Sequence, residues 1–387
     1  MRICHVTPHL PPDQAANALL PFHLGQWASA SGYVVDFVTH PPRQGRGGVP
    51  VPATHIRSRH EQPRWMRQTR IASVGEVMRI LRLAGPLISK ADIVHVHSNG
   101  LLAETAGLIA SRRGKPVVLT LYGTEVWHYR RKRGLTDLFT RLYRSATRVT
   151  FYSQGLLDRA RELGLDRPGL SVIYPPVPDS FVFHDAAAQA DLRARLHVRN
   201  RHLLVNVKRL HPLAGQRFLI EALPAILRTH PDTRLVICGT GPLQDQLKAL
   251  AQGLGVSQHI TFTGLVDNAL VAQYCAASDL FVLPSLLEAC PTVAIEALAS
   301  GTPVVSADHP GGIELHALFG DDVAVVPREQ PYALARAVID RLEHKARARS
   351  ATADVVAREF RPSVVWDRFR TTYVKALDDR GHRVATP

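Results

Sequence analysis

The sequence predicts an α/β protein with two parallel sheets, and three observations lead to this fold class. Within residues 279–306, an apolar strand, a loop, a helix and a second strand follow one another. This order is a βαβ unit, whose two strands are parallel. Residues 2–39 open the chain with the same kind of unit. After the prolines of residues 175–178 the alternation of strands and helices starts again, which predicts two domains.

Length and composition agree with this fold class. The chain has 387 residues and is 45% hydrophobic, enough to bury the cores of about two or three domains. No apolar run approaches the roughly twenty residues of a membrane-spanning helix, and the N-terminus starts directly as a strand. The four cysteines are scattered, which favours reduced thiols over a zinc site or a disulfide framework. We therefore expect a cytoplasmic protein.

Positive charge is concentrated in the first half of the chain. The net charge is +14, and residues 1–170 contain 24 Lys and Arg against 11 Asp and Glu. The basic clusters comprise Arg57, Arg59, Arg64, Arg67 and Arg70, and then Arg130, Arg131, Lys132 and Arg133. A basic face can meet anionic lipid, anionic polysaccharide or nucleic acid, and an ordinary solvated surface is the alternative. Because no nucleic-acid motif is recognisable, we expect no nucleic-acid partner, and contact with the inner face of a membrane becomes a hypothesis.

The first half contains the elements of one parallel sheet. Residues 2–8 form an apolar strand, a loop leads into a helix that Gly32 ends, and a strand follows at 34–39. Residues 41–63 are rich in Pro, Gly and Arg and predict an irregular loop, followed by a helix around residues 65–83. Further strands are expected at 92–97, 116–121, 148–153 and 171–174, with helices at 101–111 and 137–146 and another capped by Ser153.

The second half repeats the pattern. Strands are expected at 202–208, 234–238, 260–263, 280–283, 303–306 and 323–326, with helices between most of them. The predicted domains are residues 1–178 and 201–360, joined by a linker at 179–200. A final helix is expected within 361–380.

Two carboxylates mark the candidate site of the second half. Glu288 and Glu296 are separated by seven residues. Glu288 falls in the loop after an apolar strand, and Glu296 falls in the helix predicted from about Thr292 to Ser300. Ligands of parallel sheets bind at the carboxyl ends of the strands, and a helix N-terminus favours a phosphate. The alternative is that Glu288 caps the helix and Glu296 is a solvated helix residue.

The residues around these carboxylates carry a family resemblance. Pro-Ser-x-x-Glu from Pro284, Pro291, and Glu-Ala-x-Ala-x-Gly-Thr-Pro-Val-Val from Glu296 resemble the signature of the retaining family-4 glycosyltransferases of GT-B fold. Matching segments are Val207-Lys-Arg-Leu, Gly239-Thr-Gly-Pro-Leu, Phe262-Thr-Gly and Gly311-Gly-Ile-Glu. The resemblance extends from Met1 to about Leu377 and is densest in the second half. It implies two Rossmann-like domains facing across a cleft, with the last helix crossing back onto the N-terminal domain.

The resemblance implies roles on the donor side. Glu296 would hydrogen-bond the ribose hydroxyls of a nucleotide-sugar donor, Glu288 would address the sugar and the diphosphate, and Arg209 would stabilise the leaving diphosphate. The complete set of donor-binding residues implied in this way is Glu296, Arg209, Gly239, Gly241, Cys290, Pro291, Thr292 and Val293. In this reading Glu288, Arg209 and Tyr122 are the catalytic residues.

Several positions depart from the family pattern. Ala214 stands where the family has a lysine that accompanies Arg209, and strand alternation predicts that Lys208 points away from Arg209. On the acceptor side, Tyr122 replaces the histidine beside the transferred sugar. The other acceptor-side candidates are His97 at a strand end, Glu125, His128, and the pair Ala15 and Ala16, which replaces two glycines.

The function that follows is sugar transfer from a nucleotide-diphosphate sugar, with UDP-sugar as the first expectation and GDP-sugar as the second. The acceptor hydroxyl would belong to a saccharide, a lipid-linked sugar or a small molecule. Since the chain contains no Asp-x-Asp, we expect no metal, and we expect no cofactor besides the donor substrate. The alternatives are a catalytically weakened GT-B binding protein, motivated by Tyr122, Ala214 and the alanine pair, and a sugar-nucleotide epimerase.

Overall fold

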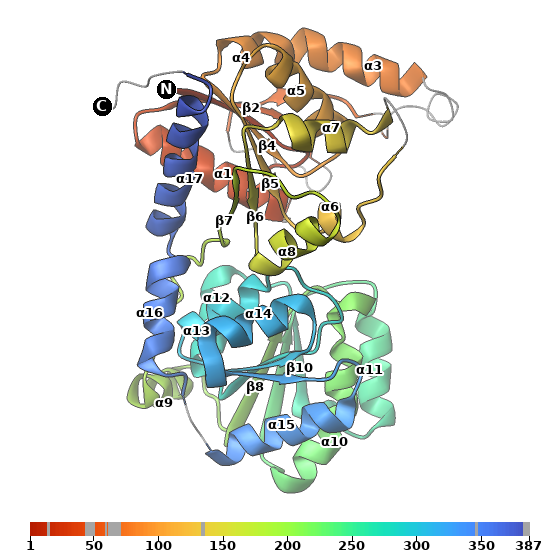
Figure 1. Ribbon diagram of the computed structural model, residues 1–387. Coiled ribbons are helices and arrows are strands. Elements are labelled where there is room, and N and C mark those ends of the chain that lie inside the picture. Colours follow the sequence, from red (N-terminus) through yellow and green to blue (C-terminus); the bar gives the residue numbers. More distant parts are fainter. Residues whose placement is uncertain are drawn as a thin grey trace. The chain divides into compact units, whose positions relative to one another are not determined.

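The computed structural model describes residues 1–13, 16–42, 51–58, 60, 71–132, 136–344 and 347–381. The chain divides into two compact units, Met1–Tyr174 with Val365–Pro387, and Pro175–Val364 (Figure 1). Some sequence predictions lie outside the described residues, namely those for Ala15, Arg59, Arg64, Arg67, Arg70 and Arg133.

The first unit contains a seven-stranded sheet of order β3-β2-β1-β4-β5-β6-β7. Its strands are β1 (Arg2–Val6), β2 (Val34–Thr39), β3 (Thr54–His55), β4 (Ile93–His97), β5 (Val117–Leu121), β6 (Arg148–Phe151) and β7 (Leu170–Val172). All six pairings between neighbouring strands are parallel, which confirms the predicted fold class for this half.

Helices cover both faces of this sheet. They are α1 (Ala16–Ala30), α3 (Ile71–Arg79), a π-helical turn (Ile80–Ala84), α4 (Gly85–Lys90), α5 (Leu101–Arg112), α6 (Thr124–Trp127), α7 (Leu138–Ser145), α8 (Gln154–Glu162) and α17 (Pro362–Asp378). Helix α5 packs on the face of Val96, where a Cβ on Gly107 would lie 3.1 Å from a Val96 methyl group. Helix α17 covers the opposite face, because Phe369 and Tyr373 contact the ring of His95. The last helix therefore returns to the first unit, as predicted.

The second unit contains a six-stranded sheet of order β10-β9-β8-β11-β12-β13, also parallel throughout. The strands are β8 (His202–Val207), β9 (Thr233–Cys238), β10 (Ile260–Gly264), β11 (Leu280–Leu283), β12 (Val304–Ala307) and β13 (Val323–Val326). The helices are α9 (Ala186–Arg195), α10 (Gln216–Thr229), α11 (Gln244–Gly253), α12 (Asn268–Ala277), α13 (Thr292–Ala299), α14 (Pro310–Phe319), α15 (Pro331–His344) and α16 (Ser350–Glu359). All six strands correspond to predicted ones.

The core of the second unit lies between the sheet and helices α10, α11 and α15. Buried leucines, isoleucines and valines of these helices pack against apolar side chains of β8, β9 and β11. Figure 1 shows α10 and α15 on one side of this sheet and α12 and α13 on the other. With both faces covered, the strands can be apolar along their whole length, as their sequences are.

The stretch predicted as a linker, residues 179–200, contains helix α9. Asp185 caps this helix by accepting a hydrogen bond from the backbone N–H of Ala188 at 2.9 Å. Gln189 is buried and donates to the backbone oxygen of Ser278 at 2.8 Å, at the end of α12. The stretch is therefore part of the second unit, which begins at Pro175. The prolines end β7, but they do not predict how the chain packs afterwards.

A single arginine joins several segments of the second unit. The Arg347 guanidinium donates to the backbone oxygens of Ser278 at 2.9 Å, Ser300 at 2.8 Å and His184 at 3.0 Å. It also donates to the hydroxyl of Thr302 at 3.0 Å. Burial lowers the pKa of Arg347 to about 10, so the side chain stays charged at neutral pH and satisfies carbonyl groups at the ends of α12 and α13.

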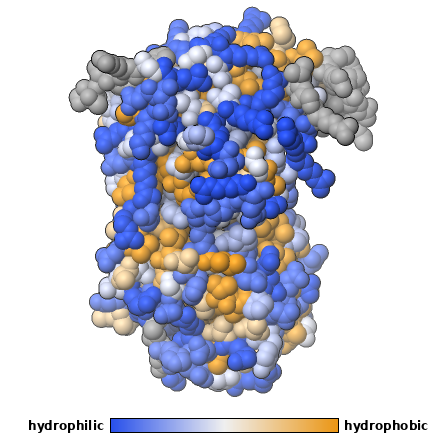
Figure 2. All heavy atoms as spheres, viewed as in Figure 1, coloured by the Kyte–Doolittle hydropathy of each residue, from blue (hydrophilic) through white to orange (hydrophobic). Residues whose placement is uncertain are grey.

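No helix in the described part of the chain is long and apolar enough to cross a membrane. Apolar side chains are nonetheless exposed on α3 and the turn after it: Val74 is 59% exposed, Met78 60% and Leu81 41%. Figure 2 shows apolar residues at the surface in this region, next to hydrophilic ones.

Candidate active site

The candidate donor site lies between β8 and β11, where the order in which the chain adds strands to the second sheet reverses. Strands β8 and β11 are neighbours, and the chain continues from β8 toward one edge of the sheet and from β11 toward the other. The loops after these two strands therefore diverge, and such a switch point is where parallel sheets bind ligands. Lys208 follows β8 and Glu288 lies in the loop after β11, so the topology brings both residues to this point.

An ion pair joins the two loops. Lys208 Nζ lies 2.7 Å from Glu288 Oε1, and both side chains are partly buried, with 27% and 14% of their surface exposed. Burial of the Glu296 carboxyl raises its pKa to about 7, and the Lys208 charge opposes this rise. One ammonium group thus acts on both carboxylates of the predicted pair.

The sequence prediction that Lys208 points away from Arg209 rests on strand alternation. Since β8 ends at Val207, alternation does not decide the direction of Lys208, whose side chain pairs with Glu288. Arg209 is exposed on the same loop. Ala214, at the position of the family's lysine, is buried, with 4% of its surface exposed. Lys208 is the lysine that the structure brings to Glu288 and Glu296.

Gly239 and Gly241 have a packing function. A Cβ on Gly239, whose φ is +136°, would lie 2.2 Å from the Lys208 carbonyl oxygen. A Cβ on Gly241 would lie 2.2 Å from the Leu210 carbonyl oxygen. The backbone N–H of Lys208 donates to Cys238 O at 3.0 Å, and this bond also holds Lys208 against the turn after β9. The two glycines allow the turn after β9 to pack directly on the backbone that presents Lys208 and Arg209.

The loop that carries Glu288 is held from two sides. On one side, Gly215 has a φ of +66°, and a Cβ there would lie 2.0 Å from the carbonyl oxygen of Pro284. On the other side, the backbone N–H of Gly311 donates to Glu288 O at 3.0 Å. The backbone N–H of Gly312 donates to His309 Nδ1 at 2.9 Å. The backbone N–H groups of Gly311 and Gly312 therefore both have acceptors within the protein.

Residues 290–293 lead into helix α13. The helix begins at Thr292, after Pro291, and no side chain caps its N-terminus. A helix N-terminus favours an anion. The N–H groups of Thr292 and Ala294 already donate to Cys290 O at 3.1 Å and to Pro291 O at 3.0 Å. Burial raises the pKa of the Cys290 thiol well above its ordinary value, with smaller contributions from Glu314 and Glu288, so the thiol stays protonated at neutral pH. Val293 occupies the second position of the helix, half-buried.

His309 is a site residue that sequence reasoning missed. It is fully buried and caps α14. Burial lowers its pKa to about 4, although the nearby Glu288 carboxylate raises it, so the imidazole is neutral at physiological pH. Its Nδ1 accepts from Gly312, and its Nε2 lies 3.3 Å from the Ser306 hydroxyl. A lone histidine before Pro310 carries no local signal that would have identified it.

In the first unit, His97 and Tyr122 come together at the carboxyl end of the sheet. His97 Nδ1 and the Tyr122 hydroxyl are 2.7 Å apart, and His97 Nε2 is 3.0 Å from His5 Nδ1. Burial lowers the pKa of both histidines and raises that of Tyr122, so all three groups are neutral. The structure thus joins the two predicted acceptor-side residues through a hydrogen bond.

His5, His95 and His97 form the one group of three potential metal ligands among the described residues, with one nitrogen of each within 4.8 Å of the others. His95 already uses both nitrogens, with the Tyr373 hydroxyl at 2.8 Å and the Thr120 hydroxyl at 2.7 Å. A metal would have to displace one of these partners. The hydrogen bonds favour a structural interpretation of the cluster.

Glu125 shapes the turn beside Tyr122. It is buried in α6, where Oε1 accepts from the Ser98 hydroxyl at 2.5 Å and Oε2 accepts from the backbone N–H of Gly123 at 2.8 Å. Both oxygens therefore have protein donors. His128 is exposed at the end of the same helix. Ala16 is the first residue of α1.

The fold is the GT-B fold, with two Rossmann-like parallel-sheet domains, as solved structures show. Sucrose-phosphate synthase from Thermosynechococcus elongatus is 18% identical, with a TM-score of 0.75 over 98% of this chain and 99% of that chain. Anabaena HepE in complex with UDP is 20% identical, with a TM-score of 0.72 over 96% of this chain and 99% of that chain.

Family models and sequence relatives identify the family. Residues 22–181 match the model "Glycosyltransferase Family 4", and residues 189–354 match "Glycosyl transferases group 1". The putative teichuronic acid biosynthesis glycosyltransferase TuaC of Bacillus subtilis is 31% identical over 321 residues, which are 81% of this chain and 76% of that protein. The chain belongs to this glycosyltransferase family.

A further relative matches over a shorter stretch. The GDP-mannose-dependent alpha-(1-6)-phosphatidylinositol monomannoside mannosyltransferase of Mycobacterium tuberculosis is 37% identical over 175 residues, which are 43% of this chain. This match spans 45% of the length of the mannosyltransferase.

Proposed function

We propose that the protein is a retaining glycosyltransferase that moves a sugar from a nucleotide-diphosphate sugar to an acceptor hydroxyl. The observation that carries the proposal is the ion pair of Lys208 with Glu288, beside Glu296, at the switch point of the second sheet. Family membership supports the same class of reaction.

The residues of the site fit distinct parts of the donor. The Glu296 carboxylate can accept hydrogen bonds from two ribose hydroxyls. Lys208 and Arg209 carry positive charge on one loop, and the positive end of the α13 dipole lies at Thr292. These groups would stabilise the negative charge that develops on the diphosphate as its bond to the sugar breaks. Glu288 holds the Lys208 ammonium group in place for this contact.

The transfer itself needs few further groups. The bond between the anomeric carbon and the diphosphate oxygen breaks, and a bond forms from the same carbon to the acceptor oxygen. The acceptor proton leaves with the diphosphate, whose oxygens are on the same face of the sugar in a retaining reaction. Tyr122, neutral and held by His97, would hydrogen-bond the acceptor or the transferred sugar. No metal or other cofactor enters this scheme.

We also propose that the first unit contacts an anionic membrane that contains the acceptor. Val74, Met78 and Leu81 follow one another at helical spacing and are exposed, in a half of the chain that carries most of the positive charge. An apolar helix face beside basic residues suits the surface of an anionic membrane, where a lipid-linked acceptor would be found. Binding to anionic vesicles at low salt that is lost at high salt would support peripheral contact at the inner membrane face.

A nucleotide panel tests the proposal most directly. Thermal unfolding would be measured with UDP, GDP, ADP and TDP, for the wild type and for Glu296→Ala. A nucleotide at about a hundred times its dissociation constant stabilises a protein by about 2.7 kcal/mol. We expect a rise in Tm for one nucleotide that is absent in the variant, and this nucleotide names the donor, UDP-sugar or GDP-sugar. A Tm that responds to none of them would overturn the proposal and favour the accessory binding protein.

A second assay distinguishes the proposed glycosyltransferase from a sugar-nucleotide epimerase. With the correct donor, a glycosyltransferase forms product only when an acceptor is present, whereas an epimerase converts the nucleotide sugar without one. Product formation that depends on the acceptor therefore supports sugar transfer, and isomerisation of the donor alone would contradict it.

A further inference from the structure

A charged cavity lies in the first unit, at the opposite end of the sheet from Tyr122. It has a volume of about 570 Å³. Its lining consists of Ser111, Arg144, Ser145, Ala146, Thr147, Arg148, Arg167, Pro168, Gly169, Asp379 and Arg380. Arg148 begins β6, whereas Tyr122 follows the end of the neighbouring parallel strand β5. The cavity is therefore at the amino end of the strands and is separate from the Tyr122 site.

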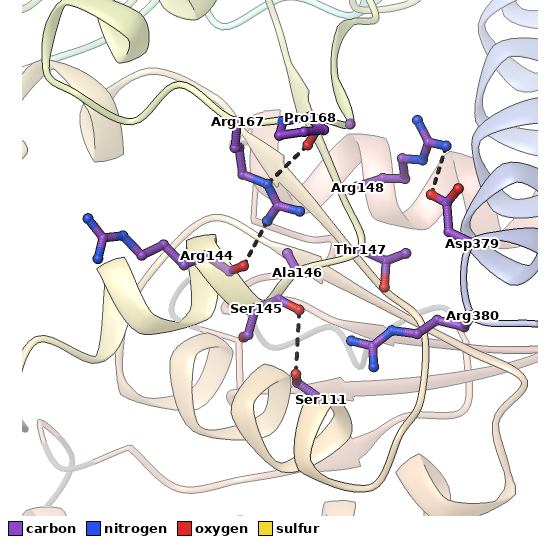
Figure 3. Close-up of a pocket in the computed structure, with 11 residues that line it drawn as sticks. Ser111, Arg144, Ser145, Ala146, Thr147, Arg148, Arg167, Pro168, Asp379 and Arg380 are labelled. Atoms are coloured by element: carbon purple, nitrogen blue, oxygen red, sulfur yellow. Dashed lines mark hydrogen bonds and ion pairs between the residues drawn. The ribbon is translucent and has the colours of Figure 1, made fainter.

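The lining of this cavity is strongly basic. It contains four arginines and a single carboxylate, that of Asp379. Arginine keeps its charge at physiological pH, so the cavity walls carry a net charge of +3. In the view of Figure 3, the guanidinium groups of Arg167 and Arg380 lie on either side of the segment 145–147.

Hydrogen bonds within the protein hold the Arg167 guanidinium in place. Its Nη1 donates to the backbone oxygen of Tyr143 at 2.6 Å and to that of Arg144 at 3.1 Å, and its Nε donates to Pro168 O at 3.1 Å. The first two carbonyls belong to the end of α7, where a positive charge is favoured. These bonds hold the guanidinium in one orientation, so little side-chain entropy remains to be lost on binding.

Arg167 and Arg148 repel each other, and one donor of Arg148 has no acceptor among the described residues. Burial lowers the pKa of Arg167, and the charge of Arg148 lowers it further. Arg148 Nη2 lies 2.7 Å from Asp379 Oδ2, whereas its Nε is buried and without a hydrogen-bond acceptor among the described residues. An anion between these side chains would relieve the repulsion and offer an acceptor to unpaired donors.

We propose that this cavity binds a phosphate group. A guanidinium presents paired N–H donors at the spacing of phosphate oxygens, and three excess positive charges match a multiply charged anion better than a single chloride. A lipid headgroup phosphate and a soluble phosphate share this chemistry. The site is independent of the proposed function, since it shares no residue with the donor site.

One variant is expected to weaken phosphate binding and another to strengthen it. Arg380→Gln removes an exposed charge at the end of α17 and should weaken phosphate binding about tenfold. Asp379→Asn removes the one carboxylate, releases Arg148 from its ion pair and should strengthen binding. Arg159→Gln changes a side chain of α8 that is 40% exposed and lies outside the cavity lining. It has the same change of charge as Arg380→Gln and should leave affinity unchanged.

The probe for soluble phosphate is pyrophosphate, titrated by calorimetry at constant ionic strength. Because the donor site would also bind pyrophosphate, all variants are made in a Lys208→Ala, Arg209→Ala background. The probe for lipid is sedimentation with phosphatidylcholine vesicles that contain or lack phosphatidic acid. Circular dichroism checks that each variant is folded.

Saturable binding that weakens in Arg380→Gln and strengthens in Asp379→Asn supports the proposal, and the probe that shows it identifies the source of the phosphate. Two results would overturn it. One is the absence of saturable binding to both probes in the protein with the intact cavity. The other is an equal loss of affinity in Arg380→Gln and Arg159→Gln, which would mean that only the overall charge matters.

Discussion

Lys208 Nζ and Glu288 Oε1 are 2.7 Å apart, and this ion pair connects the loops after two adjacent strands of the second sheet. The two residues are far apart in the sequence. The pair depends on β8 and β11 being neighbours, and it places a cation beside the Glu296 carboxyl as well. The proposed donor chemistry depends on this arrangement, and so do the first two expectations below.

Replacing Lys208 by alanine should lower kcat/KM about 100-fold, because a cation that stabilises the leaving diphosphate is lost. The expected loss of stability is below about 1 kcal/mol, because the ion pair is partly exposed. Steady-state kinetics and urea unfolding measure the two effects. Lys248→Ala, an exposed lysine of α11, is the control. If Lys208→Ala retains wild-type kcat/KM, Lys208 serves only to hold the Glu288 loop.

Glu296 should make stability depend on pH. Its pKa is raised from the ordinary value of 4.5 to about 7, so between these values the folded protein holds a proton that the unfolded chain releases. The free energy of unfolding should therefore fall as the pH rises through this window and level off above it. Urea unfolding of the wild type and of Glu296→Gln measures this. The two should be similar at low pH, and the variant, which cannot ionise, should become the more stable protein as the pH rises. Parallel pH curves for the two proteins would contradict the raised pKa.

The same titration should appear in donor binding. Only the ionised Glu296 carboxylate offers all its lone pairs to ribose hydroxyls. The dissociation constant of the nucleotide should therefore decrease as the pH rises through about 7. Calorimetry across this range measures it, and the Glu296→Gln variant should bind weakly and without this pH dependence.

Activity should survive removal of divalent metal ions. The proposed site neutralises the diphosphate with Lys208 and Arg209, so a metal ion has no required part in it. Turnover would be compared before and after dialysis against EDTA. A loss of activity that added Mn²⁺ restores would show that this expectation is wrong.

Tyr122→Phe should separate activity from stability. The substitution leaves His97 Nδ1 without its partner and should cost about 1 to 3 kcal/mol of stability. If Tyr122 also contacts the acceptor, kcat/KM should fall as well. Tyr129→Phe is the matched control, because it loses a hydrogen bond to Thr140 in the same unit. Equal kcat/KM in the two variants would leave Tyr122 a purely structural residue.

Arg347→Met should destabilise the second unit by about 3 kcal/mol, because several buried carbonyl groups lose a charged donor at once. Guanidinium unfolding followed by circular dichroism measures the change. Arg336→Met, on the exposed side of α15, should have little effect. Similar midpoints for the two variants would show that water satisfies the carbonyl groups equally well.

The sequence alone determined the family and most elements of the fold. It did not predict β3, in the loop expected at 41–63, or α9, in the linker expected at 179–200. The helix predicted from about Thr292 to Ser300 is α13, Thr292–Ala299, and all six strands of the second sheet were expected. Such elements follow from the local spacing of apolar residues and from Gly and Pro at their ends, which act over a few neighbours. The motif around Glu288 and Glu296 is likewise contiguous, so the sequence shows it directly.

The tertiary structure decided which side chains meet. Lys208 reaches Glu288 because β8 and β11 are neighbours in the sheet. Gly239 lets the turn after β9 approach the carbonyl oxygen of Lys208. Arg380 joins a cavity with Arg148 because α17 returns to the first unit. These contacts join residues far apart in the chain, and their geometry depends on strand order and on where each strand ends. Local sequence patterns carry no information about either.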